Sequence, residues 1–207
     1  MAAQDRIELV VFDVDGVLAH LDPARRLAQL SRFAGKSAEF LHQALYASDF
    51  ERSAEAGSYV PGSEYLAELN RRIAGTLTRA QWIAARRAAM TPIPAALAIA
   101  QRLRDHVRVA TLTNNGSLFK ESIAEILPDV ADLFGATFHA SFEFAARKPD
   151  PLVFHRLARR FDLKTGRILF IDDDPEYITG AQTAGMKTVL CQRTAELTGQ
   201  LGMFGLE

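Results

Sequence analysis

Two aspartates separated by a single residue follow the first apolar segment of the chain, in the run VVFDVDGV that begins at Val10. In extended backbone, side chains at i and i+2 project to the same side, so Asp13 and Asp15 can converge on one point beyond the strand. Open parallel sheets bind their ligands at such strand ends. The alternative is that Asp15 and Gly16 only form a turn, and the pair taken alone favours this simpler interpretation.

A second acidic group follows another apolar segment, in the run ILFIDDDP that begins at Ile168. Three consecutive carboxylates repel one another, so an arrangement that brings any of them near Asp13 and Asp15 requires a cation. Mg²⁺ suits a site with few carboxylates, several waters and a phosphate. The alternative is that the acids cap a helix beginning near Pro175; capping accounts for Asp174 but does not need three acids.

Two further segments carry groups that can bind phosphate. Thr113 lies in the run VATLTNNG, where a hydroxyl and exposed backbone N–H groups between a strand and a helix can hold an anion. An N-cap followed by a glycine turn is an equally good interpretation of that run. Lys148 lies in the run RKPDP. Lysine side chains are usually exposed to solvent. Like the other three groups, Lys148 follows an expected strand. It is therefore a candidate to balance the negative charge of an acidic nucleophile and of a phosphate.

The elements that must position these residues are short, nearly continuously apolar segments, typical of a sheet buried on both faces. The expected strands cover residues 7–12, 107–112, 136–140, 167–171 and 187–190. From residue 94 onward they alternate with segments of helical periodicity, which predicts a parallel sheet covered by helices. The expected helices span residues 94–104, 117–126, 151–161 and 176–184.

The stretch from residue 17 to residue 90 interrupts this alternation, because it contains no convincing strand and several amphipathic segments. We expect a helical lobe inserted after the first strand. Breaks in the pattern fall at residues 57–62 and 91–94, which are rich in Gly and Pro. The expected helices of the lobe cover residues 24–33, 40–46, 65–73 and 80–89.

The composition excludes several classes of protein. The 207 residues include 24 Lys and Arg against 25 Asp and Glu, a formal net charge of −1, which argues against a nucleic-acid partner. The single cysteine, Cys191, excludes an intramolecular disulfide and a zinc site with several cysteines. The first six residues are too polar for a signal peptide, and no apolar run approaches the roughly 20 residues of a membrane span. We expect a cytoplasmic protein with no membrane partner.

The four polar segments, in this order, resemble the four motifs of the haloacid dehalogenase-like superfamily, which consists mostly of phosphatases and phosphomutases. The resemblance rests on DVDG, on TN after the second strand, on KPDP, and on DD ahead of GAQTAGM at residues 180–186. It implies an α/β fold, with a Rossmann-like parallel-sheet core of residues 1–16 and 91–207 and an inserted α-helical cap of residues 17–90. The chain looks most similar to small bacterial phosphatases that act on sugar phosphates and similar metabolites.

The resemblance also implies a role for each candidate residue. Asp13 would be the nucleophile that forms an aspartyl-phosphate, and Asp15 the general acid that protonates the leaving group and then the base that activates water. Thr113 and the backbone N–H of Asn114 would hold the phosphoryl oxygens. Lys148 would position Asp13 and offset charge on the nucleophile and the phosphate.

The same resemblance implies a Mg²⁺ site formed by Asp13, the backbone carbonyl of Asp15, and Asp173. Counting back from Ile178, at the apolar start of the last motif's helix, selects Asp173 and leaves Asp172 just outside the ligands. Because the two acids are adjacent, a shift of one residue would make Asp172 the direct ligand instead.

The expected function is therefore Mg²⁺-dependent hydrolysis of a small phosphomonoester, such as a sugar phosphate. A phosphomutase would share the same site and stays open. A 2-haloacid dehalogenase fits less well, since such enzymes lack the second aspartate and need no metal; a non-catalytic binding protein is the remaining alternative. Substrate contacts are expected from the cap, at residues 50–52 and 57–60, whereas His20 and His42 are expected to be surface or packing residues. The protein could be a monomer or a homodimer.

Overall fold

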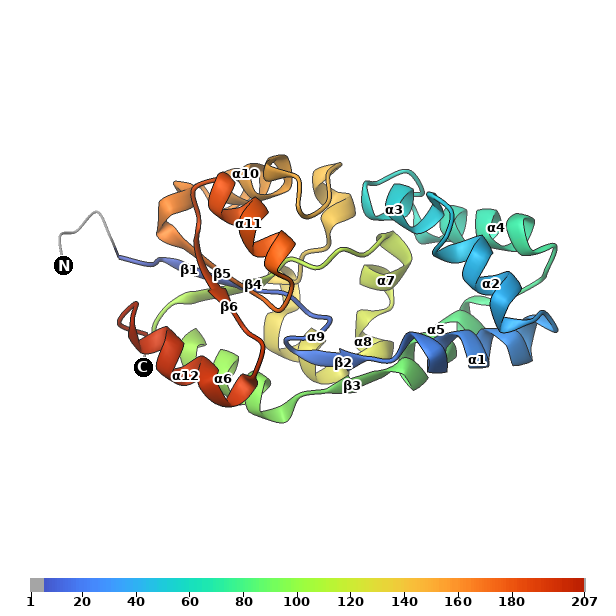
Figure 1. Ribbon diagram of the computed structural model, residues 1–207, viewed down its shortest axis with the longest axis horizontal. Helices are drawn as coiled ribbons and strands as arrows, with labels where there is room; N and C mark the ends of the chain where they lie inside the picture. Colours follow the sequence, from blue (N-terminus) through green and yellow to red (C-terminus); the bar gives the residue numbers. More distant parts are fainter. Residues whose placement is uncertain (1–5, 207) are drawn as a thin grey trace.

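The computed structural model describes residues 6–206 and contains a four-stranded parallel sheet with the order β4-β1-β5-β6 (Figure 1). The strands are β1 (Leu9–Phe12), β4 (Arg108–Thr111), β5 (Ile168–Asp172) and β6 (Lys187–Leu190). Every residue of the two central strands, β1 and β5, is buried, as expected for a sheet covered on both faces. The predicted α/β fold with a parallel sheet is confirmed.

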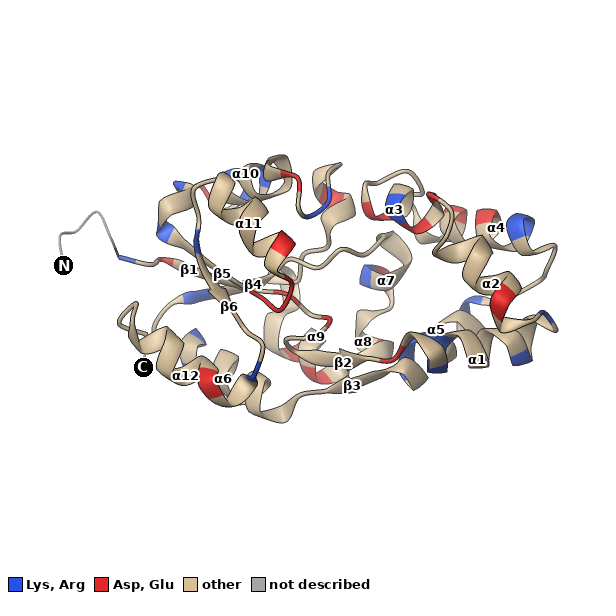
Figure 2. Cartoon of the chain, viewed as in Figure 1, with Lys and Arg blue, Asp and Glu red and all other residues tan. Residues whose placement is uncertain are grey.

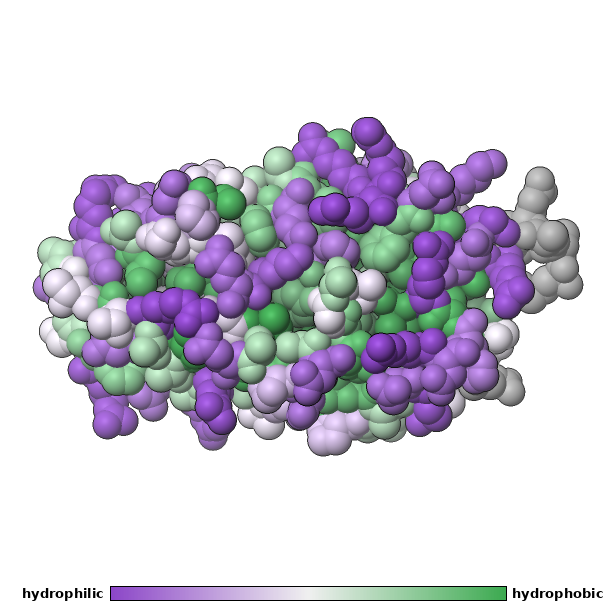
Figure 3. Space-filling view, turned by 180° about the vertical axis from the view of Figure 1, so that it is seen from behind, coloured by the Kyte–Doolittle hydropathy of each residue, from purple (hydrophilic) through white to green (hydrophobic). Residues whose placement is uncertain are grey.

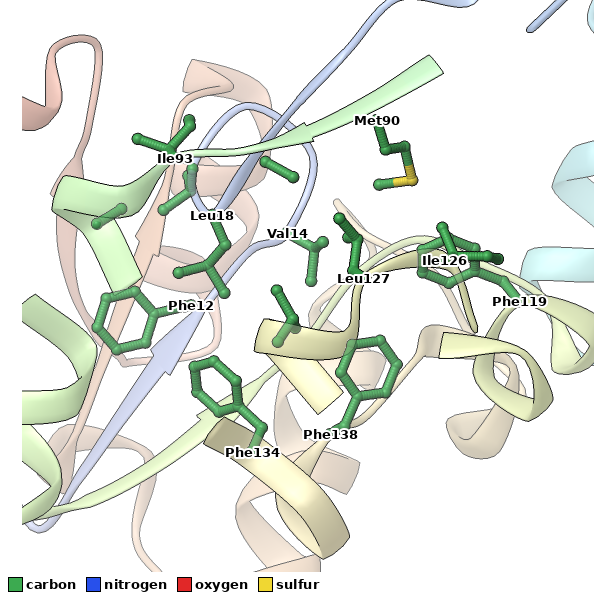
Figure 4. Close-up of a cluster of buried hydrophobic side chains, with 14 of the residues drawn as sticks. Phe12, Val14, Leu18, Met90, Ile93, Phe119, Ile126, Leu127, Phe134 and Phe138 are labelled. Carbon is green, nitrogen blue, oxygen red and sulfur yellow. The ribbon is translucent and has the colours of Figure 1, made fainter. Parts of the chain in front are cut away.

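The side chains of β1 alternate between two buried clusters, because successive residues of a strand point to opposite faces. Val10 and Phe12 belong to the first cluster, part of which is shown in Figure 4, where Phe12 lies near Phe134. Leu9 and Val11 belong to the second. Helices thus cover both faces of the sheet. The first face packs against α6 (Pro94–Arg104), α9 (Pro128–Phe134) and α12 (Thr194–Gly202), and the second against α10 (Pro151–Arg160) and α11 (Pro175–Thr183).

A helical lobe is inserted between β1 and the rest of the sheet (Figure 1). The chain enters it through β2 (Ala19–Leu21) and leaves it through β3 (Met90–Pro92), and these two segments pair antiparallel. We retain residues 17–90 as the proposed extent of the cap, since both boundaries lie at this ribbon. The helices of the lobe are α1 (Pro23–Ala34), α2 (Ala38–Leu45), α3 (Phe50–Glu55), α4 (Gly62–Ile73) and α5 (Arg79–Ala89).

Local sequence determines where the cap helices begin. Asp22 precedes Pro23, and its Oδ1 accepts a hydrogen bond from the N–H of Arg25 at 3.1 Å. This combination of an acidic N-cap and a proline in the first turn favours a helix start. Thr78 and Gln81 form a capping box at the start of α5. These caps place the starts of α1 and α5 one residue before the predicted ones.

The prediction of a strand over residues 136–140 is wrong except at its last residue, Ala140, which forms an isolated parallel bridge with Thr113. The segment begins as the 3-10 turn η1 (Gly135–Thr137). Beside it, the Thr111 hydroxyl accepts a hydrogen bond from the His139 N–H at 2.9 Å and lies 3.2 Å from the His139 carbonyl oxygen, to which it donates. The side chain of a neighbouring strand therefore satisfies backbone groups that a strand ladder would otherwise pair.

Other departures from the predicted elements concern short segments. The helix expected over residues 117–126 is interrupted at Ser122, which gives α7 (Ser117–Glu121) and α8 (Ile123–Ile126). The Ser122 hydroxyl accepts a hydrogen bond from Arg79 Nη2 at 2.9 Å. The sequence did not predict α3, α9, α12, β2 or β3, because segments of three to nine residues show little periodicity.

The surface is mixed in character. Figure 2 shows charges of both signs on the core and on the cap. Figure 3 shows hydrophilic side chains spread over the opposite face, with apolar residues between them. Within residues 6–206, no helix has the length and apolar character needed to cross a membrane.

Glu143 stabilises the start of the 3-10 turn η2 (Ser141–Phe144), which follows the expected strand. Its Oε2 accepts a hydrogen bond from the Ala140 N–H at 2.9 Å, and its Oε1 lies 2.6 Å from Lys120 Nζ. Although burial opposes the change, contacts with His139, Lys120 and the Ala140 backbone lower the pKa of Glu143 from 4.5 to about 2. We expect Glu143→Gln to lower the free energy of unfolding by about 1–3 kcal/mol near neutral pH, since charge-assisted hydrogen bonds are lost.

The effect of this substitution should depend on pH with a definite sign. Because the pKa of Glu143 is lower in the folded protein than in the unfolded chain, its stabilisation is complete above 4.5 and is lost as the pH falls toward 2. Urea unfolding of both proteins at about pH 7, 4 and 3 measures the difference. A difference that grows on acidification would contradict this account.

Candidate active site

Strands β4, β1 and β5 are in register at their carboxyl ends, so the residues that follow them leave the sheet at one edge. Asp13, Asp172 and Asp173 bring carboxylate oxygens within 4.8 Å of one another there. Figure 2 shows the acidic segments after β1 and β5 meeting at this edge. The sheet thus concentrates negative charge where α/β folds bind ligands.

The ammonium group of Lys148 lies between two of these carboxylates. Its Nζ is 2.8 Å from Asp13 Oδ1 and 2.6 Å from Asp172 Oδ2, and the residue is 1% exposed. Burial disfavours the charged form, but the attraction of Asp13 and Asp172 outweighs it and raises the pKa of Lys148. The lysine is therefore a fixed positive charge beneath the acidic cluster.

The charge of Lys148 does not offset all of the acidic charge around it. Burial raises the pKa of Asp13, the attraction of Lys148 lowers it, and the like charges of Asp172 and Asp15 raise it again; the net direction is well above the ordinary value. Burial and the charge of Asp172 also raise the pKa of Asp173. An additional cation at this position would relieve the repulsion among the carboxylates.

The loop that carries Lys148 is held from two sides. The Lys148 N–H donates to Asn114 Oδ1 at 2.9 Å, and Asn114 Nδ2 donates back to the Lys148 carbonyl at 3.0 Å. On the other side α11 approaches so closely that a Cβ on Gly180 would lie 2.1 Å from the carbonyl oxygen of Pro149. Gly180 is therefore the residue that lets the helix press against this loop.

The three consecutive acids after β5 have three different surroundings. Asp172 is fully buried, with Oδ2 on Lys148 and Oδ1 accepting from the Asp174 N–H at 2.9 Å. Asp174 accepts from the Glu176 N–H at 2.8 Å and caps α11, as predicted. The Asp173 carboxylate lies against the turn after Asp15: a Cβ on Gly16, whose φ is +93°, would be 2.2 Å from its Oδ2.

A pocket of about 280 Å³ opens above the acidic cluster. Asp13, Asp15, Thr113, Asn114, Lys148 and Asp173 line it, whereas Asp172 does not. The structure therefore brings the predicted site residues together, with Asp172 beneath the pocket floor. The pocket is also lined by Asp174, predicted only as a helix cap, and by Glu55, Arg147 and Tyr177, to which the sequence did not point.

Glu55 and Arg147 join the cap to the core at this pocket. Arg147 Nε lies 2.6 Å from Glu55 Oε2, and the Ser141 hydroxyl donates to the Glu55 carbonyl at 2.7 Å. Burial raises the pKa of Glu55 even though Arg147 opposes the shift. Arg147 directly precedes Lys148 and could have been noticed for that reason; nothing in the sequence marked Glu55.

The residues expected to set specificity occupy other positions. Phe50 is buried and stacks on Tyr65 within the cap, and Glu51 pairs with Arg26 at 3.0 Å. Neither Phe50 nor Glu51 lines the pocket. The residue of α3 that lines the pocket is Glu55, one turn further along the helix. His20 and His42 are exposed, as expected.

Asn115 is another residue near the pocket to which the sequence did not point. It is buried, and its Nδ2 donates to Thr113 Oγ1 at 2.8 Å and lies 3.4 Å from Asp15 Oδ2. Arg86, a buried residue of the cap, donates to its Oδ1. The run TNNG contains two asparagines, and the sequence offered no means of separating their roles.

A family model for haloacid dehalogenase-like hydrolases matches residues 7–185. The chain belongs to this family of hydrolases. The matched region includes all four polar segments around the pocket. The family membership that the order of these segments indicated is confirmed.

Individual members of the haloacid dehalogenase-like family resemble the chain over most of its length. Phosphatase MT3486 of Mycobacterium tuberculosis (strain CDC 1551 / Oshkosh) is 25% identical over 198 residues, covering 92% of this chain and 89% of the relative. A predicted HAD-like hydrolase from Porphyromonas gingivalis has a TM-score of 0.77 at 22% identity, over 94% of this chain and 97% of its own. HAD family enzyme BT-2542 from Bacteroides thetaiotaomicron, solved in complex with magnesium and inorganic phosphate, has a TM-score of 0.72 at 20% identity, over 88% and 93%.

The close approach of α11 in this haloacid dehalogenase-like hydrolase can be tested with glycine substitutions. We expect Gly180→Ala to lower the free energy of unfolding by about 1–3 kcal/mol, since the added methyl group would collide with the backbone of Pro149. Gly199→Ala, in α12, is the matched control: its Cβ would meet nothing within 4 Å, and the helix should gain about 0.5–1 kcal/mol. Urea unfolding measures both. Equal effects of the two substitutions would contradict the packing role assigned to Gly180.

Proposed function

We propose that the chain is a Mg²⁺-dependent phosphatase that hydrolyses a small phosphomonoester through an aspartyl-phosphate on Asp13. The observation that carries the proposal is the buried ion pair between Asp13 and Lys148, which forms the floor of a pocket also lined by Asp15 and Thr113. Membership of a hydrolase family supports it, as does the name of the Mycobacterium tuberculosis relative.

The residues present fit a Mg²⁺ ion. Oxygens of Asp13, Asp172 and Asp173 lie within 4.8 Å of one another, and hard divalent cations prefer such ligands. Both oxygens of Asp172 already have partners, so we assign the ion to Asp13, the backbone carbonyl of Asp15, and Asp173. When bound, Mg²⁺ supplies positive charge to the phosphoryl oxygens. The magnesium and phosphate bound to BT-2542 support a Mg²⁺ ion as the cofactor.

The proposed reaction consists of two displacements at phosphorus. A carboxylate oxygen of Asp13 forms a bond to phosphorus while the bond to the leaving oxygen breaks, and Asp15 gives that oxygen its proton. In the second step Asp15 takes a proton from water as the water oxygen displaces Asp13, which releases phosphate. Thr113 and the Asn114 N–H hold the phosphoryl oxygens, and Lys148 keeps Asp13 aligned.

The pocket limits the leaving group. Its volume of about 280 Å³ falls just below the range typical of drug-sized ligands, so we propose a small metabolite such as a sugar phosphate. Asp15, the second aspartate that dehalogenases of this family are expected to lack, and a carboxylate cluster suited to a metal favour a phosphatase over a dehalogenase. The ion pair between Glu55 and Arg147 supports a cap that closes over the bound substrate.

A phosphatase screen tests the function directly. Purified protein with Mg²⁺ should release inorganic phosphate from at least one member of a panel of sugar phosphates, nucleotides, phosphoglycolate and p-nitrophenyl phosphate. Excess EDTA should remove this activity, and added Mg²⁺ should restore it. Asp13→Asn should retain less than about a thousandth of the kcat, since the nucleophile is lost.

Each arm of the screen can reject part of the proposal. Conversion of a substrate without release of phosphate would indicate a phosphomutase. Failure to act on any member would favour a binding protein. Asp13→Asn turning over near the rate of the unchanged protein would reject the covalent mechanism, provided that its circular dichroism spectrum shows it to be folded.

The assignment of the metal ligand can be tested separately. Asp173→Asn should raise the Mg²⁺ concentration needed for half-maximal activity by more than about 100-fold, because it removes a direct ligand, whereas Asp172→Asn should raise it by about 10-fold. Titration of activity with Mg²⁺ gives both values. The reverse order would show that Asp172 is the ligand and that the predicted alignment is shifted by one residue.

A further inference from the structure

Arg86 is a buried cation at the boundary between cap and core. It belongs to α5, is 5% exposed, and forms no ion pair with any carboxylate among residues 6–206. Its guanidinium lies 4.5 Å from the ring centroid of Phe119, a core residue, and 5.7 Å from that of Trp82, a cap residue. Burial and the like charge of Arg26 lower the pKa of Arg86, whereas the charges of Asp15 and Glu51 oppose this. An unpaired buried charge is costly, so a structural role alone explains its presence poorly.

The hydrogen bond from Arg86 determines how the Asn115 amide is oriented. Arg86 Nη2 donates to Asn115 Oδ1, and a guanidinium has no acceptor with which to bind the other end of an amide. The oxygen of Asn115 must therefore face the cap, and its NH₂ group must face the core. There it donates to Thr113 Oγ1 at 2.8 Å and points to Asp15 Oδ2 at 3.4 Å.

This orientation acts on both neighbours. Because the Thr113 hydroxyl accepts from Asn115, its own hydrogen remains available to donate into the pocket that it lines. Asp15 Oδ1 is buried without a hydrogen-bond partner among the described residues, so Asn115 is the group that orients this carboxylate.

Other contacts also hold the cap against the core, but they do not lead to Asp15. In the same helix, Arg79 Nη1 lies 2.7 Å from Glu125 Oε1. The Gly62 N–H donates to Glu121 Oε1 at 2.8 Å. Holding the cap closed is thus a task shared by several residues, whereas contact with Asn115 is particular to Arg86.

We propose that Arg86 is a positioning residue: the closed cap places its guanidinium on Asn115, and Asn115 in turn sets the Thr113 hydroxyl and the Asp15 carboxylate for reaction. The proposal rests on the proposed function, in which Asp15 protonates the leaving group. On this proposal, the proton donor Asp15 is aligned only when the cap is closed. A site with an open cap would still bind phosphate, but with Asp15 out of position.

Substrates that differ in their need for a proton test this proposal. A p-nitrophenolate leaves without protonation, whereas the alkoxide of an alkyl phosphomonoester requires it. For Arg86→Met we expect kcat/KM to fall about 10- to 100-fold for an alkyl substrate from the screen. The fall should be at least about 5-fold smaller for p-nitrophenyl phosphate, which loses the alignment of Thr113 but does not need the proton of Asp15. Asn115→Asp keeps an acceptor for Arg86 but loses the N–H donors, and should show the same selective loss. Arg86→Lys should restore part of the alkyl activity.

Arg79→Met is the matched control, since it makes the same substitution at another cap–core contact of α5. It should change kcat/KM for the two substrates by the same factor. If Arg86→Met also changed both equally, Arg86 would only hold the cap in place, and the proposal would be overturned.

A measurement that does not depend on activity separates this proposal from the proposed function. The side-chain NH₂ signals of Asn115 in a ¹H–¹⁵N spectrum are identified by their loss in Asn115→Asp. They should exchange slowly with solvent in the unchanged protein and in Arg79→Met, and at least about 10-fold faster in Arg86→Met. Failure of the whole substrate panel would reject the phosphatase and leave this signal readable; unchanged exchange in Arg86→Met would reject the role of Arg86.

Discussion

The buried contact of Lys148 with Asp13 and Asp172 is the interaction on which the rest of the site depends. Each of these charges would be costly in the interior alone, and removal of one partner would leave the others uncompensated. The surrounding structure keeps the three together: β1 and β5 deliver the aspartates in register, while Asn114 and α11 confine the loop of the lysine. The fold therefore stabilises an arrangement that is unfavourable unless it is complete.

Much of the core and the site could be predicted because the determining patterns are local. Continuous apolar runs marked the four strands, and the acids at the ends of β1 and β5 converge because parallel strands end at one edge. The strand expected over residues 136–140 is reduced to a single bridge at Ala140 for a non-local reason. The hydroxyl of Thr111, on a neighbouring strand, bonds the backbone of His139, and no pattern within the segment reveals this.

The residues that the cap contributes to the site could not be predicted from the sequence, for a related reason. Glu55 and Arg86 act through partners far along the chain, Arg147 and Asn115, so neither stands in a recognisable motif. The predicted residues 50–52 lie on the right helix, but the helical turn directs Phe50 into the cap interior rather than toward the pocket. Spacing along a chain predicts which residues share a strand end; it does not predict which lobe will face them.

The antiparallel ribbon of β2 and β3 makes the two crossings between core and cap neighbours, with Ala19 opposite Pro92. For the sheet, the inserted lobe is therefore equivalent to a loop whose two ends are adjacent. Because its two ends are adjacent, such an insertion costs the host fold little loop-closure entropy, and this cost grows only slowly with its length. A change in the length or packing of the lobe can therefore leave the buried charges at the strand ends unchanged.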